Sequence, residues 1–402
     1  MTLRKKYFLF IGFFFLYYSC SKEPVDIDKY LIEKDGLFYK KDENNPYSGP
    51  IFSIYSDGSI KDEGNLENGK RDGSFIFWYQ DGNMEKEGSY KNGQLSGTWT
   101  YWDESGMKFM EESYENDKKS GRFVLFNEGE KIREGMYKNG KKNGLFIEWE
   151  NKIKKKEGSY HDDLLNGKWT YWDETGEKYL VETYLKGEKD GLFVEWYSNG
   201  NKHTEQYWKK DKKDGIFTEW YENGLKKQEG YLGDFNYKQG KWTFWDEKGR
   251  KYLEENYYDN EKHGFLVGWY ESGIKSLEEM YKSGKKNGFV HYWYEDGSKK
   301  QSGYFLNGLK NGKMTFWYAD GKKWLEENYK NGLKNGKMIG YYSNGRRSIE
   351  QIWKNNKLDG SFTEWYGNGQ KKKEGAYKAG ENFGEWVFYN KDGSIDRIER
   401  LD

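Results

Sequence analysis

Apolar and polar residues follow one pattern along most of the chain, and the pattern restarts at a glycine about every 24 residues. A bulky apolar residue stands two positions after the glycine, and a residue that is usually β-branched stands three positions after it. Five positions after the glycine, eleven of the fifteen units have Trp. Repetition at a fixed period indicates a repeat architecture. The opening glycines are residues 49, 73, 97, 121, 144, 167, 191, 215, 240, 264, 288, 312, 336, 360 and 384.

Each unit is predicted to be one β-hairpin. The stretch from Gly191 to Tyr197 is rich in aromatic and β-branched residues, which favour strands. Turns such as Asp81-Gly82, within a unit, and Asn92-Gly93, between units, have residues that tolerate the positive φ of tight turns. A lone hairpin is barely stable in water, so the units must stack. The sequence therefore predicts an all-β fold, an elongated open solenoid with a single twisted antiparallel sheet of about fifteen stacked hairpins.

The two faces of this sheet are expected to differ. Side chains alternate along a strand, so positions +3 and +5 after the glycine share one face and positions +2, +4 and +6 share the other. We expect the +5 tryptophans, such as Trp78 and Trp102, to form a continuous ladder of rings and the core of a thin fold. Position +4 varies between units, as in Phe77 and Glu148, so we expect the other face to be partly wet.

Composition narrows the class of protein. Aromatic residues make up 19% of the chain, and disordered chains lack such residues. The 67 basic and 67 acidic residues leave a formal net charge of zero. Nucleic-acid binding usually requires a clear basic excess, so we expect no nucleic-acid partner.

The repeat unit resembles the MORN repeat in its bacterial variant form. Clear matches run from Asn166 to Trp172 and from Asp359 to Tyr366, and the resemblance covers residues 49 to about 394. It implies an elongated β-sheet scaffold that binds proteins and, in some cases, acidic lipids. Bacterial proteins of this kind are grouped as the YwqK-type antitoxin family, which implies neutralisation of a partner toxin as a further function.

The N-terminal residues have the features of an export signal. Three basic residues precede twelve largely apolar ones, from Tyr7 to Tyr18, a run that suits a secretory signal better than a membrane span. The only cysteine, Cys20, follows Ser19, and the segment resembles a bacterial lipoprotein signal in which that cysteine is lipidated. We expect a protein anchored to a membrane of the cell envelope through lipid on Cys20. The alternative is an ordinary signal peptide and a secreted protein.

Domain boundaries follow from these patterns. Residues 1–19 are predicted to be the signal peptide and 20–29 a polar tether. Residues 30–48 look like an incomplete first unit, 49–394 are the fifteen repeats, and 395–402 are predicted to be a charged cap on the last edge strand.

Nothing in the sequence indicates catalysis, a metal site or a cofactor. The four histidines are scattered without ligand spacing. Adjacent carboxylates such as Glu254 and Glu255 recur in several units, but neighbours in a strand point to opposite faces and are poorly placed to share a substrate. We expect no enzyme.

Two features are candidates for binding. Aromatic residues at positions +4 and +6 form a candidate binding face: Tyr79, Tyr101, Tyr197, Tyr292, Phe316 and Tyr318. Lysines between hairpins form a candidate basic ridge: Lys118, Lys119, Lys141, Lys142, Lys209, Lys210, Lys212, Lys213, Lys285 and Lys286.

Three functions remain open. The leading hypothesis is an envelope-anchored scaffold that docks an unidentified protein partner. The second is a binder of acidic lipid or envelope polysaccharide, because a basic ridge attracts polyanions. The third is an antitoxin-like neutraliser of a toxin.

Overall fold

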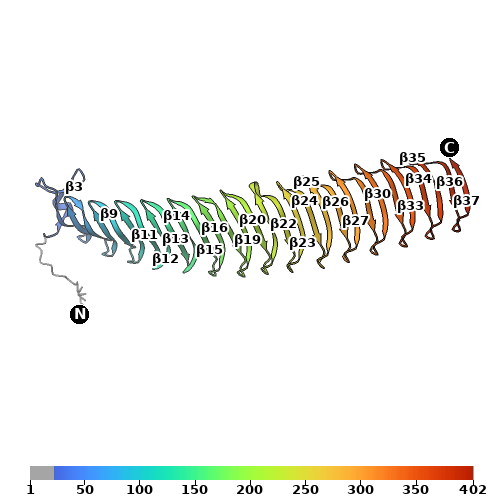
Figure 1. Cartoon of the computed structure of the whole chain (residues 1–402). Coiled ribbons are helices and arrows are strands. Elements are labelled where there is room, and N and C mark those ends of the chain that lie inside the picture. The colour runs from blue at the N-terminus through green and yellow to red at the C-terminus, as the bar shows by residue number, and fades with distance from the viewer. Residues whose placement is uncertain (1–21, 402) are drawn as a thin grey trace, which may run out of the picture. The chain divides into compact units, whose positions relative to one another are not determined.

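The computed structural model describes residues 22–401, so the predicted signal peptide, Cys20 and Asp402 lie outside the described part of the chain. The chain divides into two compact units, Met1–Leu164 and Leu165–Asp402. Both are built almost entirely of β-strands, and within each unit the strands lie side by side in chain order (Figure 1). The prediction of an all-β array of stacked hairpins is confirmed.

The first unit begins with a small N-terminal subdomain. The two-residue strand β1 (Val25–Asp26) pairs in parallel with the first strand of the array. A single helical turn, α1 (Ile27–Tyr30), follows, and β2 (Leu31–Lys34) and β3 (Leu37–Lys40) form a two-stranded sheet of their own. Residues 30–48 therefore contain one hairpin, and its two strands form a sheet separate from that of the array. The array of this unit then comprises β4 (Gly49–Ile54), β5 (Ile60–Glu67), β6 (Lys70–Arg71), β7 (Gly73–Trp78), β8 (Met84–Lys91), β9 (Gln94–Trp102), β10 (Lys108–Glu115), β11 (Lys118–Asn127), β12 (Glu130–Lys138), β13 (Lys141–Glu150) and β14 (Ile153–His161).

The second unit continues the same hairpin pattern. Consecutive strands pair antiparallel, and the segment predicted as a cap is itself the edge strand β37, which pairs with β36. One short 3-10 helix, η1 (Asp234–Asn236), lies in a turn. The strands are β15 (Leu164–Trp172), β16 (Lys178–Leu185), β17 (Glu188–Lys189), β18 (Gly191–Trp196), β19 (Lys202–Lys209), β20 (Lys212–Trp220), β21 (Lys226–Gly233), β22 (Tyr237–Trp245), β23 (Lys251–Tyr258), β24 (Glu261–Trp269), β25 (Lys275–Lys282), β26 (Lys285–Trp293), β27 (Lys299–Leu306), β28 (Leu309–Lys310), β29 (Gly312–Trp317), β30 (Lys323–Lys330), β31 (Leu333–Lys334), β32 (Gly336–Tyr341), β33 (Arg347–Lys354), β34 (Lys357–Trp365), β35 (Lys371–Lys378), β36 (Glu381–Tyr389) and β37 (Ile395–Leu401).

The two turns of a repeat differ in geometry. In the turn after the first strand, Gly82 has a φ of +90° and donates its N–H to the carbonyl of Tyr79, while Asp81 keeps a negative φ. The expected positive φ of that aspartate is therefore wrong, because this three-residue loop needs it only at the glycine. In the turn between hairpins, both Asn92 and Gly93 have positive φ, as a two-residue type I′ turn requires.

The glycine that opens each repeat is required by the backbone. All fifteen of these glycines have a φ between +60° and +150°. A side chain is strained in this region, whereas glycine enters it freely. The 24-residue period of the sequence is thus the spacing of one backbone feature, the positive φ of the glycine that opens each repeat.

Most of the buried core lies on the face that carries positions +2, +4 and +6, which we call the core face, and a few +3 side chains such as Val124 and Val194 are buried on the other. The +2 side chains of Phe75, Trp99, Trp242 and Met314 are fully buried. All eleven +5 tryptophans are only half-buried. The expectation of a core built on the +5 tryptophans is therefore wrong. The face of positions +2, +4 and +6, which was expected to be partly exposed to water, carries most of the core instead.

A ring-on-glycine contact explains this burial. The indole of Trp99 lies directly on Gly88 of the preceding strand, where an added Cβ would come within 2.1 Å of the ring. The same arrangement occurs at Gly230, where an added Cβ would come within 2.2 Å of the indole of Trp242. With no second layer of structure above this face, the ring buries its surface against the backbone of its own sheet.

Where a glutamate replaces that glycine, it is buried with two donors. Glu279 is 6% exposed, and its carboxylate accepts hydrogen bonds from the Tyr281 hydroxyl at 2.7 Å and from Lys286 Nζ at 2.5 Å. A buried carboxylate is costly unless it is paired and hydrogen-bonded. Five repeats have this arrangement of glutamate, tyrosine two residues later and lysine seven residues later: Glu112/Tyr114/Lys119, Glu182/Tyr184/Lys189, Glu255/Tyr257/Lys262, Glu279/Tyr281/Lys286 and Glu327/Tyr329/Lys334.

These contacts divide the repeats into groups of three. Gly88, Gly158, Gly230, Gly303 and Gly375 recur at every third hairpin, and the next +2 residue is Trp in four cases and Met in the other. Glu112, Glu182, Glu255 and Glu327 also recur at every third hairpin, and smaller side chains than Trp follow them. The remaining hairpin of each group varies at this position, with Gly64, Gly135, Gln206, Glu279 and Gln351, so a three-hairpin period holds at two positions of every three.

The ring-on-glycine contact predicts a sharp response to a single methyl group. We expect Gly88→Ala to lower the free energy of unfolding by about 1–3 kcal/mol, because the new Cβ overpacks against Trp99. Denaturant unfolding followed by tryptophan fluorescence measures this loss. Gly367→Ala is the matched control, because its Cβ would enter open space at a position without a positive φ. Equal midpoints for the two variants would contradict the packing argument.

The buried carboxylate of Glu279 predicts a pH dependence. Burial alone would raise the pKa of Glu279, but hydrogen bonds from Lys286, Tyr292 and Tyr281 outweigh it and hold the pKa below its ordinary value of 4.5. The ionised group therefore stabilises the fold above that pH, and the stabilisation is lost as the pH falls below it.

Glu279→Gln should accordingly lower stability by about 2 kcal/mol at neutral pH and flatten the loss of stability in acid. Urea titrations across that pH range provide the measurement. Glu295→Gln, in an exposed turn, serves as the control. An unchanged acid slope in Glu279→Gln would show that the carboxylate contributes nothing.

Candidate binding surfaces

The second face of the sheet carries positions +1, +3 and +5, and we call it the tryptophan face. The predicted ladder of stacked indoles is wrong here, because successive +5 residues are separated by a return strand, or about 10 Å of sheet. A lysine from that strand lies between them instead, as Lys251 does, 4.1 Å from the ring centroid of Trp269. This lysine–indole contact, at 4.0–5.9 Å, occurs at Trp196, Trp220, Trp245, Trp269, Trp293 and Trp317.

The same lysine is held by a glutamate three residues later. Lys226 Nζ lies 2.5 Å from Glu229, and Lys251 Nζ lies 3.0 Å from Glu254. Residues three apart in a regular strand face opposite ways, but the return strand has a bulge between them that brings both to one face. A row of Trp, Lys and Glu thus runs along the tryptophan face. Simple alternation of side chains could not have predicted it.

Charge on this face is closely compensated. Glu326 is 6% exposed and receives hydrogen bonds from Lys323 Nζ at 2.7 Å and from the Tyr341 hydroxyl at 3.1 Å, with Lys313 Nζ at 2.8 Å. Burial raises the pKa of this carboxyl, but the hydrogen bonds from the two lysines dominate and lower it to about 2. The surface is therefore strongly polar yet nearly neutral where these rows are complete.

In the second unit, the tryptophan face also exposes large apolar side chains at position +1. Phe289 is 65% exposed, Ile216 is 56% and Phe265 is 51%. Their cross-strand partners extend the patch, since Phe265 pairs with Met280 and Ile216 with Tyr231. We call these side chains the apolar stripe: Ile216, Tyr231, Phe265, Met280, Phe289 and Tyr304.

One hairpin departs from the common pattern within this stripe. His291 takes the +3 position, and its ring lies 6.4 Å from that of Phe289 and 5.9 Å from that of Trp293. The residue opposite is Ser302, where other hairpins have the lysine-binding glutamate. Three rings on one strand therefore form a local aromatic surface with less acidic charge beside it than elsewhere.

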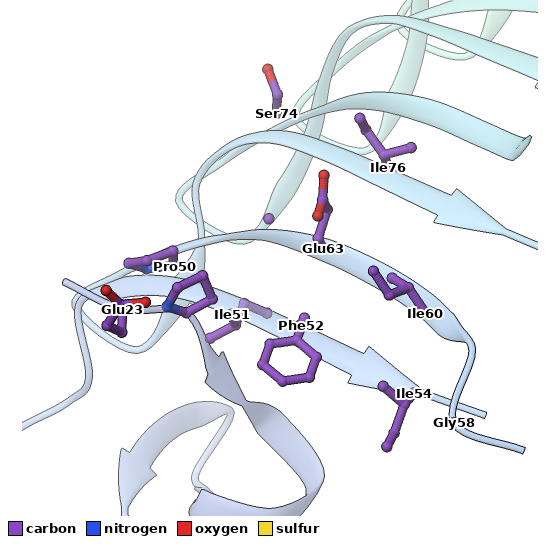
Figure 2. A pocket seen from close by; sticks show the side chains of 12 residues that line it. Glu23, Pro50, Ile51, Phe52, Ile54, Gly58, Ile60, Glu63, Ser74 and Ile76 are labelled. Carbon is purple, nitrogen blue, oxygen red and sulfur yellow. The ribbon is translucent and has the colours of Figure 1, made fainter. Parts of the chain in front are cut away.

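A hollow lies on the tryptophan face of the first unit. It has a volume of about 710 Å³ and is lined by apolar residues of the first repeat, with carboxylates at Glu23 and Glu63. Figure 2 shows Phe52 and Ile54 on one strand and Ile60 and Glu63 on the next. This site was not predicted from the sequence, although Ile54 stands where most repeats have Trp.

The residues of the predicted binding face lie on the core face and are all half-buried. The hydroxyls of Tyr79, Tyr197 and Tyr318 donate to main-chain carbonyls of the next repeat at 2.9, 2.9 and 3.1 Å. These tyrosines therefore link neighbouring hairpins.

The other three residues of that prediction are also engaged in packing. Tyr101 packs against the first core cluster, and the Tyr292 hydroxyl donates to Glu279. The ring centroid of Phe316 lies 5.4 Å from that of Trp324. Ligand binding through these six side chains stays a prediction.

The predicted basic ridge separates into two sets of lysines. The first set is half-buried and faces the core: Lys119 and Lys286 bind glutamates, while Lys142 and Lys213 lie over aromatic rings. The second set is exposed at the turns between hairpins: Lys118, Lys141, Lys209, Lys210, Lys212 and Lys285. Only the second set is placed to meet a polyanion.

Cys20, the predicted lipidation site, lies outside the described residues. Across residues 22–401, no group of three or more His, Cys, Asp and Glu side chains is placed to hold a metal ion. In the same span, no helix has the length and apolar character needed to cross a membrane.

Comparison with known proteins identifies the repeat at three places. The family model described as "MORN repeat variant" matches residues 71–92, 310–331 and 358–379. Each matched segment contains one opening glycine, at Gly73, Gly312 or Gly360. No curated protein matches the chain significantly.

Solved structures add little to this result. The crystal structure of TcdB2-TccC3-TEV is 10% identical, with a TM-score of 0.17, over 86% of this chain and 21% of its own. TcdB2-TccC3 without its hypervariable C-terminal region is 9% identical, with a TM-score of 0.13, over 86% of this chain and 23% of its own. The chain thus spans about a fifth of the length of these proteins, and at such TM-scores the likeness indicates nothing about function. The protein is a β-hairpin repeat protein that matches the MORN repeat variant at three places.

Proposed function

We propose that the protein is a non-catalytic scaffold, anchored in the cell envelope, whose tryptophan face docks a protein partner. The observation that carries this proposal is the apolar stripe of the second unit, where Phe265 and Phe289 are more than half exposed. Phe265, Met280, Phe289 and Tyr304 lie on four consecutive strands, and apolar side chains that adjoin on a protein surface usually mark an interaction site. The most exposed side chains of the stripe lie outside the buried core, whose largest members stand at position +2 on the other face.

The surroundings of the stripe support a protein partner. Protein interfaces have an apolar, aromatic centre and a polar rim. Here Phe289 and Tyr304 form an edge-on ring pair at 5.2 Å, and rows of paired lysine and glutamate flank the stripe. Such a rim can form hydrogen bonds with a partner, and its net charge is small because each lysine is paired with a glutamate.

Anchoring in the envelope rests on the sequence alone. The basic and apolar residues before Cys20 suit an export signal, and lipid on Cys20 would tie the array to a membrane. A single acyl chain gives only marginal membrane binding, so stable anchoring needs more than one chain or a second contact.

Exposed lysines favour a second function, the binding of acidic lipid or envelope polysaccharide. Lys209 lies directly opposite Lys212, and Lys282 directly opposite Lys285, across turns three hairpins apart. Like charges directly opposite in a sheet are unfavourable, so these pairs carry a cost to folding. A polyanion lying along this edge would offset that cost.

Partner capture tests the docking proposal. The detergent-solubilised full chain should retain a protein that is lost when Phe265 and Phe289 are both changed to Ser, because the substitutions remove the centre of the apolar stripe. Mass spectrometry of the captured proteins is the measurement. Phe235→Ser is the matched control, since Phe235 is 73% exposed in a turn outside the stripe. Capture that is equal for all three baits would contradict docking at this face.

Vesicle sedimentation tests the second function. The double variant Lys282→Ser, Lys285→Ser should bind phosphatidylglycerol vesicles about thirtyfold less tightly, because each of the two lysines near an anionic surface contributes about 1 kcal/mol. Lys330→Ser, at the single lysine of another turn, should have a smaller effect. Binding that is insensitive to salt and to both variants would exclude the exposed lysines as the site.

A further inference from the structure

The hollow of the first unit is a place where the array lacks its own lysine–indole contact. In a complete repeat such as the one at Gly215, Trp220 lies opposite Lys226 across the hairpin. In the first repeat the equivalent pair is Ile54 and Ile60. Neither isoleucine fills the space of the residue it replaces, and both are exposed at the hollow.

The acidic partner of the missing lysine is nevertheless present. Glu63 stands three residues after Ile60, as Glu229 stands three residues after Lys226. In the complete repeat, Glu229 holds that lysine at 2.5 Å. Among residues 22–401, no basic group lies within ion-pair distance of Glu63 or of Glu23 on the opposite rim. The hollow thus combines an apolar floor with two carboxylates that have no cation.

An open strand edge lies beside the hollow. β1 pairs with β4 over two residues only, Val25 with Ile51 and Asp26 with Phe52. In the described part of the chain, no strand continues this pairing past Phe52 toward Ile54. An extended segment could therefore add to this edge and place its side chains over the hollow.

We propose that the hollow binds an extended basic peptide segment of a protein partner, which supplies the aromatic or aliphatic side chain and the lysine or arginine that the first repeat lacks. The apolar side chain would cover Ile54 and Ile60, and the cation would bind Glu63 and Glu23. The partner would thereby complete, from outside, the contact that the array makes within itself at Trp220, Trp245, Trp269 and Trp293. This inference rests on the proposed docking function and gives its partner a stated chemistry.

A short peptide makes the test direct. The probe is acetyl-Val-Trp-Val-Lys-Val-amide, whose β-branched residues favour an extended chain and whose Trp and Lys fall on one face. The full chain carries labelled isoleucine methyl groups, and the shifts of Ile54, Ile60 and Ile76 report on the hollow. We expect saturable shifts at these three residues. Replacement of the peptide's lysine by norleucine should weaken binding about three- to fivefold, as for an exposed ion pair.

Two variants of the protein separate the parts of the proposal. Glu63→Gln should reduce the preference for lysine over norleucine while leaving an apolar contribution. The double variant Ile54→Trp, Ile60→Lys restores the common repeat, so it should fill the hollow and abolish the shift at Ile76, the reporter that it retains, without lowering the melting temperature. Because that variant adds a contact that the fold already uses, a loss of binding would not reflect unfolding.

The remaining outcomes would overturn the proposal. Equal binding of the lysine and norleucine peptides would remove the role of the carboxylates. Hexylammonium binding as tightly as the peptide would assign the hollow to a small cation, and shifts that grow with protein concentration alone would assign it to a second copy. Persistent peptide binding by the filled variant would place the site elsewhere. Failure here leaves the capture experiment at Phe265 and Phe289 unaffected, so the two proposals fail separately.

Discussion

The packing of one large side chain onto the bare backbone of the neighbouring strand is the constraint on which this structure depends. A single-layer sheet has no second layer to bury its apolar surface, so each +2 ring must find cover within its own face. Gly88 provides that cover for Trp99, and its missing Cβ allows the ring to lie flat on the strand. Where a smaller +2 residue follows, the strand can carry Glu112 instead, provided that a tyrosine and a lysine satisfy the carboxylate.

This constraint leaves the opposite face with a smaller share of the core, mainly +3 side chains such as Val124 and Val194. The half-buried indoles there are covered by lysines that are themselves held by glutamates, as at Trp269, Lys251 and Glu254. Such contacts are individually weak because they are exposed to solvent. A partner can therefore replace or extend them without opening the core. The apolar stripe and the hollow both lie on this face, which is why both proposals concern it.

Much of the fold could be predicted from the sequence, because it follows from period and turn chemistry. The glycine spacing, the aromatic strands and turns such as Asn92-Gly93 determine the hairpins and their number. The choice of buried face could not be predicted in the same way. Alternation separates Trp99 from Trp102 but does not say which of the two is covered, and the more frequent +5 tryptophans suggested the wrong face.

The candidate site was harder to predict for a related reason. Tyr stands at position +6 in nine of the fifteen repeats, but this recurrence alone does not say that the hydroxyl, as in Tyr79, donates to a main-chain carbonyl of the next repeat. The bulge that brings Lys251 and Glu254 to one face is likewise invisible to a strict two-residue period. By contrast, Ile54 and Ile60 could be recognised from the sequence, because most other repeats have Trp and Lys at these two positions.

The three-hairpin period of the core face also constrains how such an array can change in length. Removing one hairpin would bring a Trp against a strand that carries a buried glutamate, or leave a glycine beneath a side chain too small to cover it. Removing three hairpins, about 72 residues, would join hairpins of the same Gly or Glu type at two positions of each group of three, and only the variable third position would meet a different neighbour. Three hairpins are therefore the length by which such an array can be shortened or extended with the least change to its core face, although the sequence period is the single 24-residue repeat.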